Sequence, residues 1–189
     1  PVAPDEVDRV RRTYGLEGRR WLIYPVITYP HKDHGTLIAA FARIAATHPD
    51  VDLVLTGGEG PAEADVRAAI AASGVAPRIH RTGRIDRADL DALIAGAAAV
   101  AFPSRFEGFG NGALEGLAKG TPVVASDATS LPEVVGAAGL LVPPGDPAAW
   151  ADALVRVLDD DALATRLGAA GRAQAARFTD RAGAEALVF

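Results

Sequence analysis

The sequence predicts an α/β domain built on a doubly wound, parallel, six-stranded sheet, the Rossmann-like arrangement. Five short runs of apolar, often β-branched residues and one more polar run, at residues 78–82, are each followed by a segment with helical character. Such alternation gives right-handed crossovers and a parallel sheet covered on both faces. The chain has 189 residues, of which 49% are hydrophobic and 23% charged, so it can bury the core of one domain.

The predicted strands are the short apolar runs, and the predicted helices are the segments whose apolar residues recur three and four positions apart. The strands cover residues 21–28, 51–56, 78–82, 99–102, 121–126 and 139–142. Helices are expected near residues 37–45, 66–70, 90–97, 111–119 and 150–158, and two further helical segments run to Phe189. Residues 20–176 therefore form the predicted Rossmann-like domain.

Start and stop residues separate these elements. Pro30 stops the first strand, and Gly120 ends the helix after the fourth strand. Asp146 is expected to cap the helix that follows the last strand. Ser130 and Glu133 have the Ser-x-x-Glu spacing of a capping box, which predicts a short helix there.

Composition excludes several classes of protein. The net charge of -5 disfavours a nucleic-acid partner, because phosphate backbones recruit basic surfaces. No run approaches the roughly 20 apolar residues that span a bilayer, and nothing resembles a signal peptide, so a cytoplasmic location is expected. Without cysteine there is no disulfide or thiolate metal site. The chain lacks methionine and begins at Pro1, so we expect a piece of a longer protein, with charged residues 1–19 as a joint to a missing N-terminal domain.

The two most polar, glycine-rich loops are predicted to face each other. In a sheet of order 3-2-1-4-5-6, ligands bind where the loops after strands 1 and 4 diverge, and these loops are residues 28–35 and 103–112. The second loop leads into a helix whose unpaired amides favour an anion, and its alternating glycines at 108, 110 and 112 let a ligand approach the backbone. Lys32 in the first loop supplies a point charge, so we expect a diphosphate between the loops.

Two glutamates lie on either side of the glycines. Glu107 precedes the helix, and Glu115 is expected in its first turn. Carboxylates repel phosphate, but they accept hydrogen bonds from hydroxyl groups such as those of sugars. We therefore expect Glu107 near the outer sugar of a nucleotide sugar and Glu115 near its ribose.

The segment Phe102-Pro-Ser-Arg-Phe-Glu-Gly-Phe-Gly110, together with Glu115, resembles the signature of the retaining GT-B glycosyltransferases of family GT4. The similarity covers roughly residues 20–180. Residues like those of the family recur at Thr82-Gly-Arg-Ile85, Gly120-Thr-Pro-Val-Val-Ala125, Leu131-Pro-Glu-Val-Val135, Gly139-Leu-Leu-Val-Pro-Pro-Gly-Asp146 and Arg177-Phe178.

The resemblance implies the C-terminal, donor-binding half of a two-domain enzyme. Such an enzyme transfers a hexosyl group from GDP-mannose or a UDP-sugar to a glycan or lipid-type acceptor, with retention, and uses no metal, other cofactor or protein nucleophile. The acceptor binds mainly to the missing N-terminal half, through which any membrane association would also occur. The half present here is therefore expected to be inactive alone, and residues 177–189 would form a helix crossing toward the other half.

The resemblance also implies roles for residues. Lys32 would contact the diphosphate, Glu115 the ribose, and Glu107 the transferred sugar, which makes Glu107 a donor-positioning residue. The implied donor-binding residues are Lys32, Arg84, Glu107, Gly108, Phe109, Gly110, Asn111, Gly112 and Glu115, with Lys32 and Glu107 nearest the chemistry.

Two positions depart from the family's pattern. Ile27 stands where many members have an arginine five residues before the lysine, and His31 or Arg105 could supply that positive charge instead. Asn111 stands where many members have an aliphatic residue.

Other interpretations of the same residues stay open. The module could bind a nucleotide or a partner without catalysis. Glu115 could be a helix-start carboxylate, the three glycines a tight turn, and Arg84 a surface residue. Residues 57–60 are expected to form a turn. His31 and His34 lack the further ligands of a metal site, and no Gly-x-Gly-x-x-Gly follows the first strand, which disfavours a dinucleotide-dependent oxidoreductase.

Overall fold

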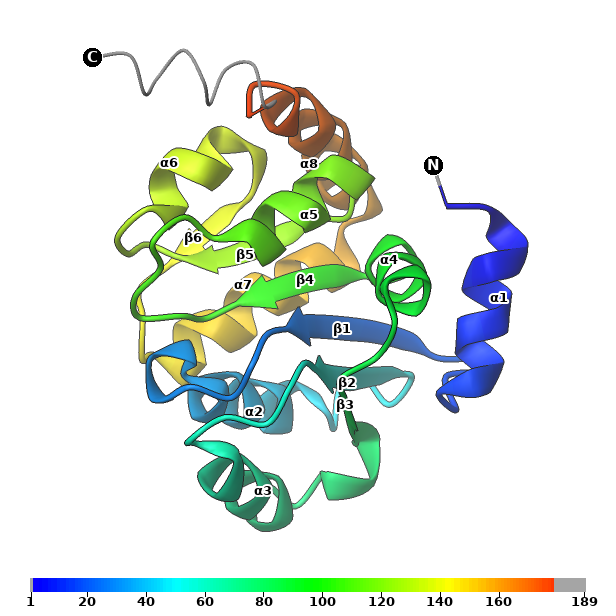
Figure 1. Ribbon diagram of the computed structural model, residues 1–189, viewed down its shortest axis with the longest axis vertical. Helices are drawn as coiled ribbons and strands as arrows, with labels where there is room; N and C mark the ends of the chain where they lie inside the picture. The colour runs from blue at the N-terminus through cyan, green and yellow to red at the C-terminus, as the bar shows by residue number, and fades with distance from the viewer. Residues whose placement is uncertain (1, 179–189) are drawn as a thin grey trace.

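The computed structural model describes residues 2–178 as one sheet with helices on both faces (Figure 1). Six parallel strands lie in the order β3-β2-β1-β4-β5-β6, which confirms the doubly wound fold class. The strands are β1 (Arg20–Pro25), β2 (Val51–Thr56), β3 (Ile79–Gly83), β4 (Ala99–Phe102), β5 (Val123–Ser126) and β6 (Leu140–Val142). β1 ends at Pro25, three residues before Thr28, the predicted end of the strand.

The helices follow the strands as the apolar spacing predicts. They are α1 (Pro4–Thr13), α2 (His34–Ile44), α3 (Glu63–Ala72), α4 (Arg87–Ala95), α5 (Asn111–Lys119), α6 (Leu131–Val135), α7 (Pro147–Asp159) and α8 (Asp161–Ala175). Figure 1 shows α4 and α5 in front of the sheet and α7 behind it, where α7 packs against α2.

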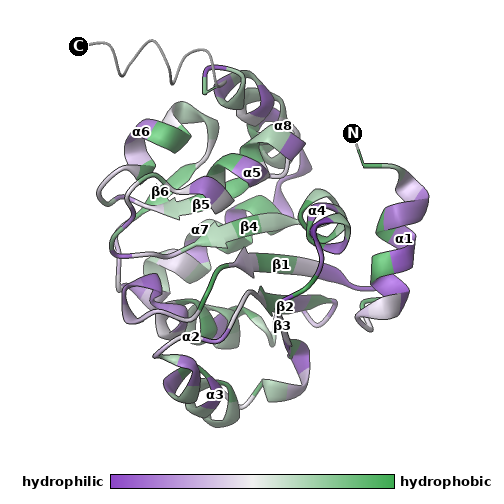
Figure 2. Cartoon of the chain, viewed as in Figure 1, coloured by the Kyte–Doolittle hydropathy of each residue, from purple (hydrophilic) through white to green (hydrophobic). Residues whose placement is uncertain are grey.

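The core lies on both faces of the sheet. β2, β4 and β5 are buried along their whole length, as the strands of a parallel sheet covered by helices must be. The largest fully buried side chains include Trp21 of β1 and Trp150 of α7. Figure 2 shows the hydrophobic colouring concentrated in the central strands, with more hydrophilic residues on α1.

Two of the predicted helix ends are confirmed, and the proposed capping box is wrong. Asp146 accepts hydrogen bonds from the amides of residues 148 and 149 at the start of α7, and Gly120 ends α5 with a left-handed φ of 74°. Ser130 precedes α6, but its side chain makes no cap hydrogen bond to that helix. Its hydroxyl bonds instead to the carbonyls of Glu107 and Phe109.

The amino-terminal residues, expected only as a joint, contain a helix that packs on the domain. α1 lies against α4, with Val10 and Leu16 fully buried. The Tyr14 hydroxyl donates to Asp89 of α4 at 2.6 Å. Burial and this hydrogen bond together raise the pKa of Tyr14 to about 12. The described residues end at Phe178, so nearly all of the helix predicted over residues 177–189 lies outside them. Within residues 2–178, no helix is long and apolar enough to cross a membrane.

Asp52 of β2 is the centre of a buried charge cluster on the edge strands. It contacts Arg19 at 2.5 Å, His80 at 2.9 Å and Arg78 at 3.5 Å, and its side chain is only 6% exposed. Burial alone would raise the pKa of Asp52, but the hydrogen bonds from Arg19 and His80 outweigh it and hold the pKa below its usual value. The cluster joins the segment before β1 to β2 and β3.

Candidate functional site

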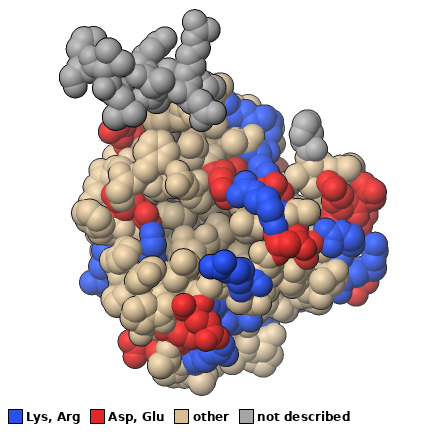
Figure 3. Space-filling view, in the orientation of Figure 1, with Lys and Arg blue, Asp and Glu red and all other residues tan. Residues whose placement is uncertain are grey.

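The loops after β1 and β4 face each other across a cavity of about 430 Å³, as the topology predicted. Figure 3 shows charged residues gathered over α1, α4 and α5 and in another group over α3, while the surface over the left-hand ends of β1 and β4 carries few. The cavity is lined by Pro25, Val26, Ile27, Tyr29, His31, Lys32, Phe102, Glu107, Phe109, Gly110, Asn111 and Gly112. Of the predicted donor-binding residues, only Arg84, Gly108 and Glu115 are outside this lining.

Lys32 and Glu107 meet across the cavity in an ion pair. Lys32 ends a short 3-10 turn, η1 (Pro30–Lys32), and its Nζ donates to Glu107 Oε1 at 2.6 Å. The side chains are 16% and 9% exposed, so each buried charge depends on the other for compensation. The pair therefore contributes no net charge to the cavity.

Tyr24 of β1 ties the two loops together beneath this pair. Its hydroxyl donates to the Lys32 carbonyl at 2.8 Å and lies 2.8 Å from the Ser104 hydroxyl, from which it accepts. Burial holds the pKa of Tyr24 well above its usual value, so the hydroxyl keeps its proton. A second tie is the amide of Arg105, which donates to the His31 carbonyl at 2.8 Å. The loops are thus joined by hydrogen bonds within the protein.

The three glycines of the second loop meet different constraints. Gly110 has a φ of 99°, and a Cβ there would lie 2.7 Å from Leu131. A Cβ on Gly112 would lie 2.7 Å from the ring of Phe102. Both glycines are therefore needed by the fold itself, as the alternative interpretation allowed. Gly108 is exposed, is not left-handed and would have no atom within 4 Å of a Cβ, so local packing does not require glycine there.

Thr129 and Ser130, which precede α6, hold the Glu107 loop in place. The Thr129 hydroxyl accepts from the Glu107 amide at 3.0 Å, and the Ser130 hydroxyl donates to the carbonyls of Glu107 and Phe109 at 3.1 and 3.0 Å. Thr129 has a left-handed φ of 50°, which is rare for a β-branched residue. This is the physical reason that the capping-box prediction fails, because the Ser130 hydroxyl is used by a loop more than twenty residues away.

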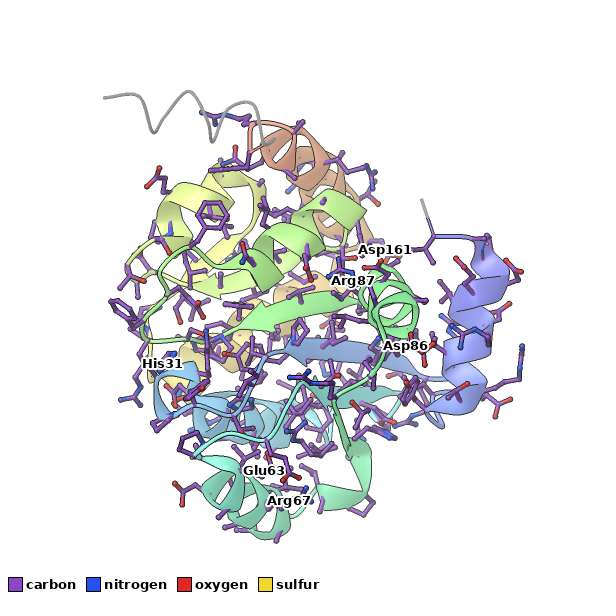
Figure 4. The ribbon with its side chains drawn as sticks, viewed as in Figure 1. His31, Glu63, Arg67, Asp86, Arg87 and Asp161 are labelled. Carbon is purple, nitrogen blue, oxygen red and sulfur yellow. The ribbon has the colours of Figure 1, made fainter. Side chains whose placement is uncertain are left out.

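A buried ion pair that the sequence did not reveal supports the first loop. Arg81 of β3 contacts Glu63 of α3 at 2.8 Å, and the Thr28 hydroxyl donates to the same carboxylate at 3.0 Å. Figure 4 shows Glu63 at the start of α3. Burial alone would raise the pKa of Glu63, but the hydrogen bonds from Arg81 and Thr28 lower it. Gly60 donates its amide to Thr28 and comes so close that a Cβ would lie 2.7 Å from the Thr28 carbonyl oxygen.

Glu115 and Arg84 lie next to the main cavity, not in its lining. Glu115 is the fifth residue of α5, so it is not in the first turn as predicted. Its carboxylate accepts from Arg87 at 2.7 Å, an unpredicted partner seen beside α4 in Figure 4. Arg84 lines a smaller cavity of about 200 Å³, which shares Pro25, Val26 and Ile27 with the main one. The two cavities are therefore neighbours at the carboxyl ends of β1 and β2.

His31 and Arg105, the two residues that could supply the positive charge absent at Ile27, lie differently relative to the main cavity. Ile27 lines the main cavity and leaves that position uncharged. Arg105 Nε donates to Asp33 at 2.8 Å, and Arg105 is not in the cavity lining. His31 is exposed and does line the cavity.

The two histidines of the first loop have different surroundings. His34 is buried with its ring 4.8 Å from that of Tyr24, and burial lowers its pKa to about 4, whereas His31 is exposed. Across residues 2–178, no group of three or more histidine and acidic side chains is arranged to hold a metal ion.

The sheet order, the cavity at the carboxyl ends of β1 and β4, and the helix that starts in its wall define a Rossmann-like domain of the GT-B glycosyltransferase fold. The sequence profile described as "Glycosyl transferases group 1" matches residues 21–160. The chain therefore belongs to the family of glycosyl transferases group 1.

Curated relatives and solved structures agree with this family. The chain is 39% identical over 158 residues to a D-inositol 3-phosphate glycosyltransferase of Corynebacterium diphtheriae, covering 80% of this chain and 37% of that protein. It is 35% identical to the O-antigen chain mannosyltransferase B of Escherichia coli, covering 95% and 47%. The structure of HepE from Anabaena, solved in complex with UDP and glucose, matches with a TM-score of 0.87 and 25% identity, covering 98% and 52%. The chain thus spans about half of each of these proteins or less.

Proposed function

We propose that this domain binds a nucleotide diphosphate sugar in the main cavity and serves as the donor half of a retaining glycosyltransferase. The observation that carries the proposal is the convergence of Lys32, Glu107 and the N-terminus of α5 on one cavity. The whole enzyme would transfer a hexosyl group from GDP-mannose or a UDP-sugar to a glycan or lipid-type acceptor without a metal ion. The relatives named for mannosyl transfer and the neighbour solved with UDP and glucose support this proposal.

The unpaired amides at the start of α5 would receive the diphosphate, because an α-helix leaves its first amides without partners and carries a partial positive charge there. Lys32 has three N–H donors, so it could keep Glu107 on one and bind a phosphate oxygen with another. The ion pair with Lys32 makes Glu107 a poor nucleophile, so Glu107 would instead position the sugar by accepting hydrogen bonds from its hydroxyl groups. Glu115 and Arg84 would act from the neighbouring surface, on the ribose and the nucleotide.

Binding tests this proposal on the chain as it stands. Thermal shift with UDP, GDP, ADP and their sugars is expected to give a stabilised domain with at least one nucleotide sugar. Lys32→Ala should weaken that binding about tenfold or more, because a hydrogen bond to a charged group is lost. Glu107→Ala should weaken the sugar nucleotide more than the free nucleotide.

Lys119→Ala is a matched control. Lys119 is also paired with a carboxylate, Asp91, at 2.8 Å and is 19% exposed, but it lies at the opposite end of α5 from the cavity. It should leave binding unchanged. If no nucleotide or nucleotide sugar shifts the melting temperature, or if Lys32→Ala and Lys119→Ala behave alike, the donor-site proposal is wrong.

Transfer itself is tested in the longer protein that includes an N-terminal half. Sugar transfer there should persist in EDTA and fall sharply in the Lys32→Ala and Glu107→Ala variants, and the half described here should be inactive alone. Binding without any transfer by the longer protein would instead identify a non-catalytic nucleotide-binding module.

A further inference from the structure

The main cavity has little net positive charge for a diphosphate ligand. Among the described residues that line it are one lysine, Lys32, and one glutamate, Glu107, which compensate each other in an ion pair at 2.6 Å. A diphosphate brings a negative charge on each phosphate. The N-terminus of α5 offers only a partial positive charge, equivalent to about half an elementary charge. The lining of the main cavity therefore offers a diphosphate no uncompensated full positive charge, and Arg84 lines the neighbouring cavity instead.

His31 is placed to supply such a charge. Its ring stacks on Tyr29 with centroids 5.6 Å apart and planes at 16°, and it meets Phe106 edge-on at 6.5 Å. Its carbonyl accepts from the Arg105 amide, which fixes the backbone against the opposite loop. Figure 4 shows His31 on the loop beyond the carboxyl end of β1, beside the loop that follows β4. The ring therefore has a defined position in the cavity wall.

The charged groups around His31 are already paired with one another. Glu107 is bound by Lys32, and Asp33 accepts from Arg105 and from a threonine hydroxyl. Tyr29, the stacked neighbour, has neither a carboxylate nor a basic group. Within residues 2–178, His31 itself forms no ion pair, so its ring nitrogens are available to a ligand in the cavity. Histidine is the side chain whose charge changes between about pH 5 and 8, and a nearby anion favours its charged form.

We infer that His31 is the second cationic ligand of the donor diphosphate, and that its imidazole takes up a proton from solvent when the nucleotide sugar binds. The protonated ring then donates an N–H to a phosphate oxygen. This inference rests on the proposed donor site. It makes donor affinity depend on pH, with tighter binding in the pH range in which the imidazole is protonated.

Isothermal titration calorimetry tests this with UDP-glucose or GDP-mannose, whichever the thermal-shift screen finds bound. The nucleotide sugar is the right probe because a free nucleoside diphosphate ends in a phosphate that itself titrates near about pH 6. Wild-type affinity is expected to be about three- to tenfold weaker at pH 8 than at pH 6, the size expected of one charged hydrogen bond at a part-exposed site. Repeating the titration in buffers of different ionisation enthalpy should show net proton uptake.

Two variants of His31 separate charge from shape. His31→Phe keeps the aromatic contacts but cannot bind a proton, so it should bind weakly at both pH values and take up no proton. His31→Lys carries a fixed charge, so it should bind equally well at both. Lys119→Ala, at the opposite end of α5 from the cavity, should keep the wild-type affinity and pH dependence.

The outcomes distinguish this inference from the donor site itself. If wild type binds the nucleotide sugar equally at both pH values, if His31→Phe keeps the pH dependence, or if Lys119→Ala removes it, His31 is not the second cation, while the donor site stands. If no nucleotide sugar binds at either pH, both proposals fail. Circular dichroism of each variant checks that it is folded.

Discussion

The ion pair between Lys32 and Glu107 makes a sharp prediction about stability. Glu107→Gln keeps the shape of the side chain but leaves the Lys32 ammonium, 16% exposed, without its partner. Breaking a fully buried pair costs about 3–5 kcal/mol, and exposed pairs contribute about 0–1 kcal/mol. With side chains 16% and 9% exposed, this pair lies between these limits, so we expect each single variant, Glu107→Gln or Lys32→Met, to lose about 2 kcal/mol of unfolding free energy.

The double variant provides the decisive measurement. Because it leaves no unpaired charge, it should be no less stable than either single variant, which gives a coupling energy of about 2 kcal/mol or more in a double-mutant cycle from urea unfolding. Additive losses, with coupling under about 0.5 kcal/mol, would refute the argument that each charge depends on the other. The double variant should also fail to bind a nucleotide sugar although it is folded, which separates the pair's part in stability from its part in the proposed donor site.

Three further predictions concern the fold around the site. The pKa of His34 is lowered to about 4, so the unfolded chain binds a proton that the folded chain does not, and unfolding free energy should fall by about 3 kcal/mol between about pH 6.5 and pH 4. His34→Leu should abolish this fall in unfolding free energy, measured by urea unfolding at each pH. An unchanged dependence on pH would contradict the assignment. Asp52→Ala removes the buried carboxylate that three basic side chains contact, so the protein should lose about 3 kcal/mol of unfolding free energy, measured by urea unfolding. A loss under about 1 kcal/mol would show that water compensates these side chains instead. Gly112→Ala should lower the melting temperature by several degrees because its Cβ meets the Phe102 ring, while Gly108→Ala should not; equal melting temperatures would contradict this packing argument.

The topology could be predicted from the sequence because it rests on local patterns. Alternating apolar runs and helical spacing identified the strands, and the parallel order follows from general rules of chain crossover. Asp146 and Gly120 ended their helices as expected because caps involve residues only a few positions apart. α1 was missed because its charged sequence has only a few apolar residues, of which Val10 is the one buried within the helix.

The supports of the site could not be predicted, because they join residues far apart in the sequence. Ser130 satisfied a local capping pattern, yet its hydroxyl bonds to the Glu107 loop. Tyr24 looked like one more aromatic residue in a core strand, and only its position shows that its hydroxyl reaches the Lys32 carbonyl. Arg81 lies in a predicted strand and Glu63 lies before the helix predicted near residues 66–70, with no spacing that connects them. A long charged side chain inside a predicted strand, such as Arg81, is the one signal that could have pointed to a buried partner.

The structure also shows which parts of the site are fixed before any ligand arrives. Tyr24 and the Arg105 amide join the two loops, and Ser130 holds the second one, through hydrogen bonds that involve backbone atoms and the Ser104 hydroxyl. Such ties lower the ordering cost of binding, because the loops do not have to be brought together by the ligand. The charged side chains of Lys32 and Glu107 compensate each other across the cavity and can exchange partners without moving the backbone. Changes in ligand preference within this fold are therefore expected from side chains in the cavity wall, while substitutions at the backbone ties should reduce binding of every ligand alike.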